Sequence, residues 1–447
     1  MSELLDIANR IIGWADAGED VEAYVVHRRD TDIKVYEGAI EELASAESDG
    51  VGIRVVSDHR EGFAYTGSLD EEILRETLQE ARDNASFASR EDWVALPQPD
   101  GVSPADVDLW RDSLASVPTE RKVEMALELD RMVRARDPRI RNVESSQYGD
   151  QLGERAVAST TGISSYDRST ACYLVTIPIA GEGDDSHIAA GYSVGREVDD
   201  LDLEAAVAMG VEDATILIGA TKPTSTRLPV VFDRRVASSI ISIIASTLDG
   251  DAVLKGRSLF AKRLGEEIAG PGIQLTEDPR ETRAINAARH DAEGLACRPV
   301  ELIRDGVLQT FLHNSESARR TGVASTASAA RADFKSKPGI SMRAVSLAPG
   351  DMDEAAIIAA VGNGLFVKNI IGTNSGVNRI SGDISVGAEG LMIRNGQLAE
   401  PVRECTIATT IQRLLKEILH VGNDTEWLVS SSAGVTLAVD GIALSGL

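Results

Sequence analysis

Helical and strand-forming segments follow one another in an irregular order along this 447-residue chain. Regular alternation of strand and helix would indicate parallel βαβ units, whereas runs of strands with occasional helices indicate an α+β architecture. In the last part, Asp305-Gly306, Asn395-Gly396 and Asp440-Gly441 each lie between apolar runs, the pattern of two-residue β-hairpins. We therefore expect an α+β fold in which N-terminal α+β units precede a C-terminal unit rich in antiparallel hairpins around a central helix.

Changes in composition divide the chain into four segments. Pro97, Pro99 and Pro104 cluster where the apolar periodicity is lost, which is typical of a connector. We expect an N-terminal α+β subdomain, a connector, a second α+β subdomain and a C-terminal domain, at residues 1–88, 89–117, 118–226 and 227–447. Helices are predicted near 4–12, 71–81 (after a Ser68-x-x-Glu71 capping box), 118–135, 201–218, 315–321, 352–362 and 406–419. In the first half, strands are predicted at 22–26, 32–36, 48–56, 61–66, 139–148, 152–160 and 162–180.

The charge balance excludes several classes of function. Lys and Arg number 45 and Asp and Glu number 71, so the formal net charge is −26. Such a chain is repelled by phosphate backbones and anionic lipid surfaces, and we expect neither a nucleic-acid nor a membrane partner. No apolar run is long enough to cross a bilayer, and the N-terminus lacks the pattern of a secretory signal. Three widely spaced cysteines argue against a disulfide framework, so a cytoplasmic location is expected.

One helix stands out in the last segment. Five aliphatic residues recur at helical spacing between Asp233, which is a suitable N-cap, and Gly250, which is a suitable stop. They form one apolar stripe of Val236, Ile240, Ile243, Ile244 and Leu248. The pattern predicts an amphipathic helix packed into the core, and Ile241 widens its apolar face.

The segment 232–267 resembles the central helix and following loop of the TldD/TldE (PmbA-like) peptidase family. Further stretches resemble the family in the family's order: Gly256-x-Ser258, Asp291-x-Glu293-Gly294, Arg304-Asp305-Gly306, Thr321-Gly322, Gly372-Thr373-Asn374-Ser375-Gly376, Ser381-Gly382-Asp383 and Val421-Gly422-Asn423-Asp424. The resemblance covers most of the chain and is most specific in the last unit.

The departures from the family pattern concern its metal site. In metal-bearing TldD-type members the helix carries His-Glu-x-x-x-His, and here Ile241, Ser242 and Ser246 stand in that frame. These members also carry a Cys in a loop whose counterpart here, residues 425–433, has none. A catalytic zinc site needs about three N, S or O ligands and an open position. The resemblance therefore implies a TldE-type chain with no catalytic, cofactor-binding or metal-binding residues, and with zinc in a partner chain.

Chemistry elsewhere in the chain has little support. None of the six histidines lies within four residues of another, so no two of them have the close sequence spacing of paired metal ligands. His290 lies near Asp291 and Glu293, where an acid–base pair is conceivable but a polar loop is favoured. Cys405 is expected at the start of the helix 406–419, where a thiolate could be stabilised, although a buried structural cysteine is favoured.

The resemblance implies a metal-free, TldE-like subunit of a heterodimeric zinc metallopeptidase, inactive alone, that cleaves unfolded peptides or peptide-like conjugates with a TldD-like partner. Without that partner a homodimer is possible. Residues expected to bind substrate at the chamber wall are Gly372, Thr373, Asn374, Asn378 and Arg379, because glycine admits a close backbone and Asn and Arg can bond peptide groups. Two alternatives stay open: a self-sufficient hydrolase with a non-metal nucleophile such as Cys405 or a serine, and a non-enzymatic peptide-binding adaptor or regulator.

Overall fold

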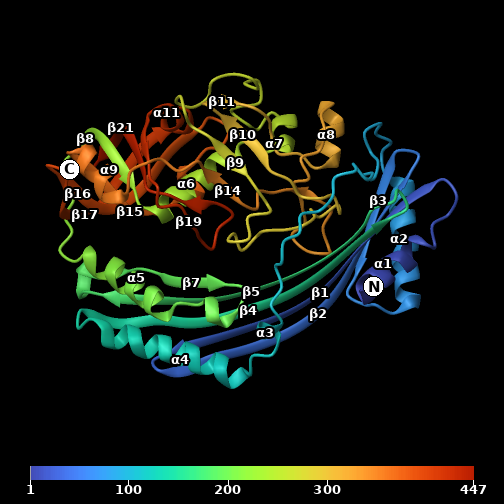
Figure 1. Ribbon diagram of the computed structural model, residues 1–447, viewed down its shortest axis with the longest axis horizontal. Helices are drawn as coiled ribbons and strands as arrows, with labels where there is room; N and C mark the ends of the chain where they lie inside the picture. The colour runs from blue at the N-terminus through green and yellow to red at the C-terminus, as the bar shows by residue number, and fades with distance from the viewer. Residues whose placement is uncertain (1) are drawn as a thin grey trace.

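A long, curved antiparallel sheet forms one half of the molecule in the computed structural model, which describes residues 2–447 (Figure 1). Its strand order is β3-β2-β1-β4-β5-β6, and β7 also pairs with β5. The strands are β1 (Glu19–Tyr36), β2 (Ala39–Ser57), β3 (Arg60–Thr66), β4 (Ile140–Ser159), β5 (Ser164–Ala180), β6 (His187–Ile188) and β7 (Gly191–Gly195). The first two predicted α+β units therefore share one continuous sheet, and the boundaries expected at 88 and 117 stay a prediction.

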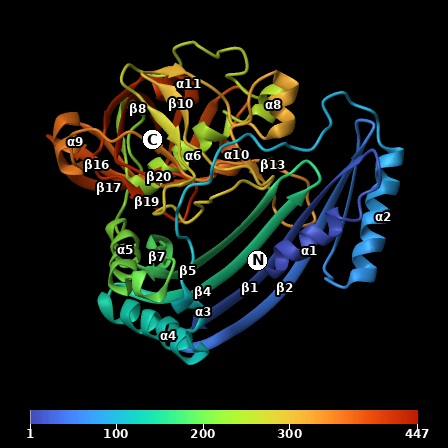
Figure 2. The same cartoon turned by 45° about the vertical axis from the view of Figure 1, so that its right-hand side comes forward.

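Helices cover one face of this sheet at both ends (Figure 2). Alternate residues of β1 explain this: Val21, Ala23 and Val25 pack under α1 and α2, while Ile33 and Val35 pack under α4. The intervening even-numbered residues face the other way, toward the C-terminal unit. The helices are α1 (Glu3–Ile12), α2 (Glu71–Phe87), α3 (Asp112–Ala115), α4 (Thr119–Arg136) and α5 (Leu203–Ile216), with single 3₁₀ turns at Gly183–Asp185 and Val198–Asp200.

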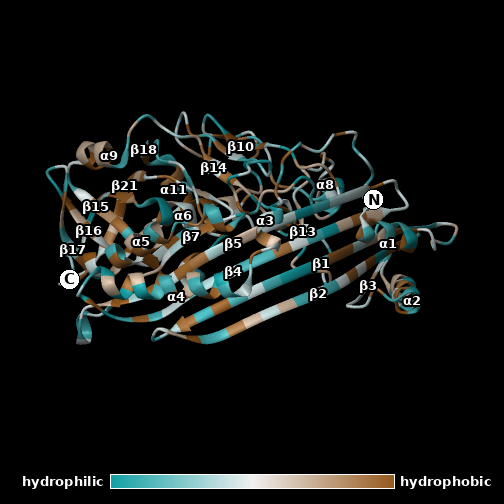
Figure 3. Cartoon of the chain, turned by 60° about the horizontal axis from the view of Figure 1, so that its bottom comes forward, coloured by the Kyte–Doolittle hydropathy of each residue, from teal (hydrophilic) through white to brown (hydrophobic). Residues whose placement is uncertain are grey.

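The strand β2 has an unusual free edge. It pairs with β1 along its whole length, but β3 pairs only with Val51–Ser57. Residues 39–48 are all exposed, including Ile40 and Leu43. In Figure 3 this part of β2 is the outer border of the sheet. Ten residues of backbone therefore run along the sheet edge with no strand from residues 2–447 on their outer side.

The C-terminal unit is built on a six-stranded sheet ordered β17-β16-β15-β8-β21-β18, in which β17 also pairs with β21 and closes a ring. Its strands are β8 (Thr226–Phe232), β15 (Gly364–Ile371), β16 (Asp383–Arg394), β17 (Gln397–Thr410), β18 (Ile418–Val421) and β21 (Leu437–Ser445). A four-stranded sheet and two strand pairs accompany it, formed by β9 (Leu275–Glu277), β10 (Val300–Arg304), β11 (Val307–Leu308), β14 (Val345–Leu347), β12 (Ala329–Ala330), β13 (Gly339–Ile340), β19 (Glu426–Trp427) and β20 (Ala433–Gly434). The expected α+β class is confirmed.

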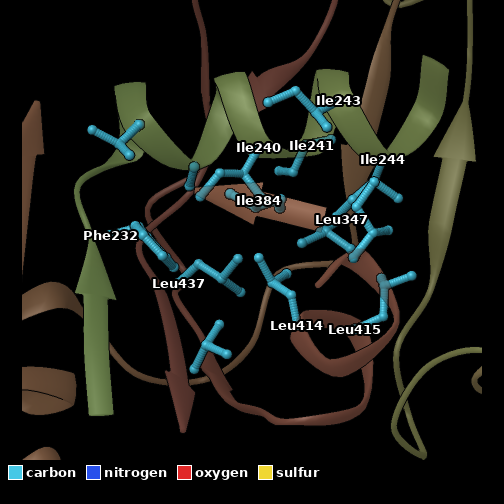
Figure 4. Close-up of a cluster of buried hydrophobic side chains, with 14 of the residues drawn as sticks. Phe232, Ile240, Ile241, Ile243, Ile244, Leu347, Ile384, Leu414, Leu415 and Leu437 are labelled. Atoms are coloured by element: carbon cyan, nitrogen blue, oxygen red, sulfur yellow. The ribbon is translucent and has the colours of Figure 1, made fainter. Parts of the chain in front are cut away.

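The predicted central helix is α6 (Arg234–Ser246), and Asp233 caps it by accepting the Arg235 amide. It ends four residues before the expected stop at Gly250, because Asp249 caps a second short helix, α7 (Gly250–Leu254). Figure 4 shows its isoleucines among Ile384, Leu414 and Leu437 of the main core. The remaining helices are α8 (Ser315–Thr321), α9 (Glu354–Val361), α10 (Thr373–Gly376) and α11 (Ile411–Lys416).

Three local predictions are wrong. The helix expected at 406–419 is reduced to α11, because residues 406–410 continue β17 and pair with β16, and residues 406–408 also pair with β21. Asp440-Gly441 forms no hairpin but lies within β21, where the register shifts and Gly441 has φ of 66°. The side chain that caps α2 belongs to Asp70, which accepts the amides of Glu72 and Ile73.

Candidate functional site

We call positions 241, 242 and 246, which correspond to His, Glu and His in the metal-bearing pattern, the α6 frame. These three positions do not share one face of the helix. Ile241 is 0% exposed and belongs to the main hydrophobic core (Figure 4). Ser242 and Ser246 are half-buried, on a stripe with the exposed Ser239. Positions five residues apart lie about 140° apart around an α-helix, so 241 and 246 cannot share one narrow face. Of the α6 frame, Ile241 therefore packs in the core, while Ser242 and Ser246 lie on a half-buried stripe of hydroxyl-bearing side chains.

A network of serine hydroxyls joins α6 to the loop 425–433. The Ser242 hydroxyl donates to Ser432 Oγ at 2.9 Å, and the Ser238 hydroxyl lies 2.8 Å from the Ser432 carbonyl oxygen. Ser238 Oγ is also 2.7 Å from Ser430 Oγ. This loop is the one that carries a Cys in metal-bearing members, and here its serines satisfy the polar positions of the helix. Neutral hydroxyls are not the N, S or carboxylate ligands that zinc takes in proteins.

Arg379 is the one predicted substrate-binding residue that reaches the frame. Its Nε donates to Ser246 Oγ at 2.9 Å, so a guanidinium occupies the neighbourhood of the second histidine position. A fixed positive charge there opposes the binding of a metal cation. Within residues 2–447 no group of three or more His, Cys, Asp or Glu side chains is arranged to hold a metal.

The other predicted substrate-binding residues lie on the turn between β15 and β16. Gly372 has φ of 81°, and the Asn378 side chain accepts the Ile380 amide at 2.9 Å, which shapes the turn itself. Thr373 and Asn374 belong to α10. This turn does not contribute to the lining of the large cleft described below. Substrate binding by these five residues stays a prediction.

The cleft lies between the long sheet and the C-terminal unit, with a volume of about 670 Å³. Its sheet side is formed by β1, β4 and β5, and its opposite side by the loops 285–289, 330–334 and 341–343 together with Ser431. Sequence reasoning missed it, because these segments are far apart in the chain. The one available signal was the alternation in β1 that leaves Tyr24, Val26, Arg28 and Asp30 on the face away from the helices.

A buried charge cluster joins the sheet to the C-terminal unit beside the cleft. Glu22 accepts Arg54 Nε at 2.8 Å and also an Nη2 hydrogen bond from Arg331, and the side chains of Glu22 and Arg331 are both 0% exposed. Burial opposes ionisation of Glu22, but the two guanidiniums outweigh it and hold its pKa below the usual value. Arg54 also lies 3.8 Å from Glu293, which belongs to the segment Asp291-x-Glu293-Gly294.

An aromatic contact strengthens the same junction. Phe334 lies over β2 at Gly50 and Gly52, where a Cβ on either glycine would overlap it. Its ring also stands edge-on to Tyr65 of β3, with 6.2 Å between ring centroids. The loop 330–334, which lines the cleft, is therefore packed against β2 and β3.

A second ionic junction lies near the N-terminus of α6. Arg235 pairs with Asp213 of α5, and Lys368 of β15 lies 3.2 Å from Asp213 and 2.9 Å from Asp233. Burial disfavours the charge on Lys368, but Asp233 and Asp213 outweigh it and raise its pKa. The C-terminal unit is thus tied to the sheet on two sides, with the cleft between.

The acidic segment around His290 is structural. His290 Nδ1 lies 2.9 Å from Asp167 of β5, and Arg155 bonds both Asp167 and the His290 carbonyl. Asp291 accepts the amides of Glu293, Leu295 and Ala329, and burial together with the neighbouring Glu293 charge raises its pKa to about 7. His290 therefore pairs with a residue of the long sheet rather than with Asp291 or Glu293.

Cys405 does not begin a helix but lies within β17, 4% exposed, with its thiol donating to the Ala388 carbonyl at 3.1 Å. Burial raises the pKa of this thiol to about 11. All three cysteines are buried and free. A thiol that is both protonated and covered is a poor nucleophile.

Comparison with known proteins places this architecture in a class. Three family models match in order: PmbA/TldA metallopeptidase domain 1 at residues 21–85, the central domain at 112–218 and the C-terminal domain at 225–446. The scaffold is thus that of a metallopeptidase family with three consecutive conserved parts. The chain belongs to the PmbA/TldD family.

Curated relatives and solved structures agree with this assignment. The Metalloprotease PmbA homolog of Haemophilus influenzae is 27% identical over 411 residues, covering 91% of this chain and 88% of the relative. Metalloprotease PmbA of Escherichia coli O157:H7 is 26% identical, covering 90% and 86%. In fold, the chain is similar to a putative modulator of DNA gyrase from Thermotoga maritima (TM-score 0.91, 22% identity, 98% and 99% covered) and to TldE from Thermococcus kodakarensis (TM-score 0.88, 20% identity, 99% of each).

Proposed function

We propose that this chain is the metal-free, TldE-like subunit of a two-chain zinc metallopeptidase, with a TldD-like chain of the same family as its partner. The observation that carries the proposal is the state of the α6 frame. Ile241 is packed in the core, Ser242 bonds Ser432, and Ser246 accepts from the Arg379 guanidinium. The family scaffold is retained while its ligand positions serve packing and hydroxyl pairing.

In such an assembly the zinc of the partner would activate water and polarise the scissile carbonyl. This chain would complete the chamber and restrict entry to unfolded peptides or peptide-like conjugates. The ionic junctions on both sides of the cleft support a rigid, shaping role. Among residues 2–447 no helix is long and apolar enough to cross a bilayer. We place the complex in the cytoplasm, where free buried thiols such as Cys172, Cys297 and Cys405 persist.

The self-sufficient hydrolase is disfavoured by the same contacts. The Cys405 thiol is buried with a raised pKa, and in the described chain the hydroxyls of Ser238 and Ser242 bond other serines rather than a histidine base. The adaptor alternative makes a different prediction, since an adaptor binds peptides without supporting cleavage.

The test is a three-way hydrolysis assay with a casein-derived unfolded peptide. This chain, a metal-bearing relative, and their co-expressed mixture are compared with and without a chelator. We expect a stable mixed dimer, cleavage by the mixture alone, and loss of cleavage with the chelator. Chelator-resistant cleavage by this chain alone would establish the independent hydrolase. A mixture that neither associates nor cleaves would favour the adaptor.

A further inference from the structure

The sheet side of the cleft has a floor of small residues. Gly153 of β4 pairs directly with Ser169 of β5, and Ala171 follows two residues later on the same face. They share this face with Arg155 and Asp167, which contact the C-terminal unit. No atom of residues 2–447 other than its chain neighbours lies within 4 Å of where a Gly153 Cβ would stand. The centre of the sheet is therefore open to a ligand.

The opposite side of the cleft carries two guanidiniums without a carboxylate partner. Arg289 donates Nε to the Ala105 carbonyl, and Arg343 donates Nη2 to the Ala329 carbonyl at 2.7 Å. Neither forms an ion pair with any described side chain. Arg343 Nε is buried and has no hydrogen-bond acceptor within the described chain. A buried N–H donor without an acceptor is costly, so the described chain does not fully satisfy the Arg343 guanidinium.

The acidic groups of the cleft are already occupied. Asp30 pairs with Arg28, Asp167 with Arg155 and His290, and Asp333 accepts the Lys335 amide. The remaining lining carboxylate, Glu154, accepts the Tyr166 hydroxyl. Six guanidiniums line the cleft against four carboxylates, so on a chain of net charge −26 the cleft lining carries an excess of positive charge.

We propose that this cleft binds an extended peptide through a carboxylate, held by Arg289 and Arg343, with the peptide lying over Gly153 and Ser169. Guanidinium groups bind carboxylates in strong, charge-assisted hydrogen bonds. The cleft volume of about 670 Å³ lies within the range of small-ligand pockets. The choice of a peptide rests on the proposed function. The carboxylate belongs either to an acidic side chain or to a free C-terminus.

The experiment measures binding to the full chain alone by fluorescence anisotropy. Three labelled tetrapeptides are compared: an end-blocked all-alanine peptide, an end-blocked peptide with two glutamates, and an all-alanine peptide with a free C-terminus. Loss of a hydrogen bond to a charged group weakens binding by about 10-fold or more, so we expect the best carboxylate peptide to exceed the blocked alanine peptide by that factor. The stronger of the two carboxylate peptides identifies the source.

Variants separate the site from the fold. Arg289→Gln and Arg343→Gln should each weaken the carboxylate peptide about 10-fold and leave the blocked alanine peptide unchanged. Gly153→Leu should abolish binding of all three peptides, because it fills the floor in a position free of neighbours. Arg257→Gln is the matched control, since Arg257 is exposed and outside the cleft lining. Thermal unfolding checks that each variant is folded.

Equal binding of neutral and acidic peptides, no binding at all, or unaltered binding by the folded Arg289, Arg343 and Gly153 variants would each overturn the proposal. This outcome is independent of the cleavage assay. A mixed dimer that cleaves, built from a chain that ignores acidic peptides, would refute only the cleft site. Carboxylate binding by a chain that never supports cleavage would refute only the subunit role.

Discussion

Removing the charge of Glu22 should weaken the junction between the long sheet and the C-terminal unit more than any surface ion pair. In Glu22→Gln, Arg331 loses its carboxylate partner in a site where its side chain is 0% exposed. Arg54 still has Glu61 at 3.4 Å and Glu293 at 3.8 Å, so most of the penalty falls on Arg331. Breaking a buried ion pair on one side costs about 3–5 kcal/mol, and we expect Glu22→Gln to lower the free energy of unfolding by that amount.

The companion variants show where the penalty comes from. Arg331→Met leaves Glu22 with both Arg54 hydrogen bonds, so the loss should be only about 1.5–3 kcal/mol, the worth of one hydrogen bond to a charged group. The double variant Glu22→Gln/Arg331→Met removes the stranded guanidinium. Its loss should therefore be smaller than the sum of the single losses by about 1 kcal/mol or more.

Urea unfolding at pH 7, followed by fluorescence of the four tryptophans, measures these values. The exposed pair Arg394–Glu400 provides the control, and Glu400→Gln should cost less than about 1 kcal/mol. Because the folded-state pKa of Glu22 is lowered, its contribution is present above the unfolded pKa and is lost as the pH falls through the folded pKa. The wild-type chain should thus lose this contribution in acid, and Glu22→Gln should not. A Glu22→Gln loss under about 1 kcal/mol, or strict additivity in the double variant, would refute the reasoning.

Three further outcomes are expected. Elemental analysis of the purified chain should find no stoichiometric zinc; about one zinc per chain, lost on mutating particular His or Cys residues, would contradict the interpretation of the α6 frame. Cys405→Ala should leave cleavage by the mixed dimer unchanged, and iodoacetamide should label Cys405 only after unfolding, because its thiol is covered and its pKa is raised to about 11. Gly50→Leu should displace Phe334 and speed limited proteolysis of the loop 331–337. In a Phe334→Ala background, adding Gly50→Leu should not change the proteolysis rate further. Equal protease resistance of the wild type, the Gly50→Leu variant and the double variant would show that this contact does not hold the loop.

Some helices were predictable almost to the residue. The segment 315–321 matches α8, and the stripe from Val236 to Ile244 matches the buried face of α6. Long strands were harder, because β1 and β4 were expected as two strands each. In the middle of β1 the residues Arg28, Arg29 and Asp30 are charged on both faces, since one face meets a polar cleft and the other a gap between helices. Local hydrophobicity therefore falls where the strand continues.

The β17 error has a related cause. Residues 405–410 satisfied a helical pattern, but Cys405 and Ile407 alternate inward in a strand that is bonded on both sides. Pairing with distant strands decided the outcome, and no local signal reports it. The cleft was unpredictable for the same reason. The guanidiniums of Arg289 and Arg343 lie opposite a floor contributed by residues more than a hundred positions earlier, and only the tertiary fold brings them together.

The free edge of β2 has a consequence for how such a chain stays dispersed. Exposed backbone along residues 39–48 is a template onto which another molecule could add a strand, the first step of edge-to-edge aggregation. Its side chains include Glu41, Glu42 and Glu47, so a second copy would set carboxylates against carboxylates. Self-pairing is thereby discouraged at neutral pH, while a strand with basic side chains meets no such barrier. The charge along this edge therefore disfavours pairing with an identical chain and permits pairing with a strand of opposite charge.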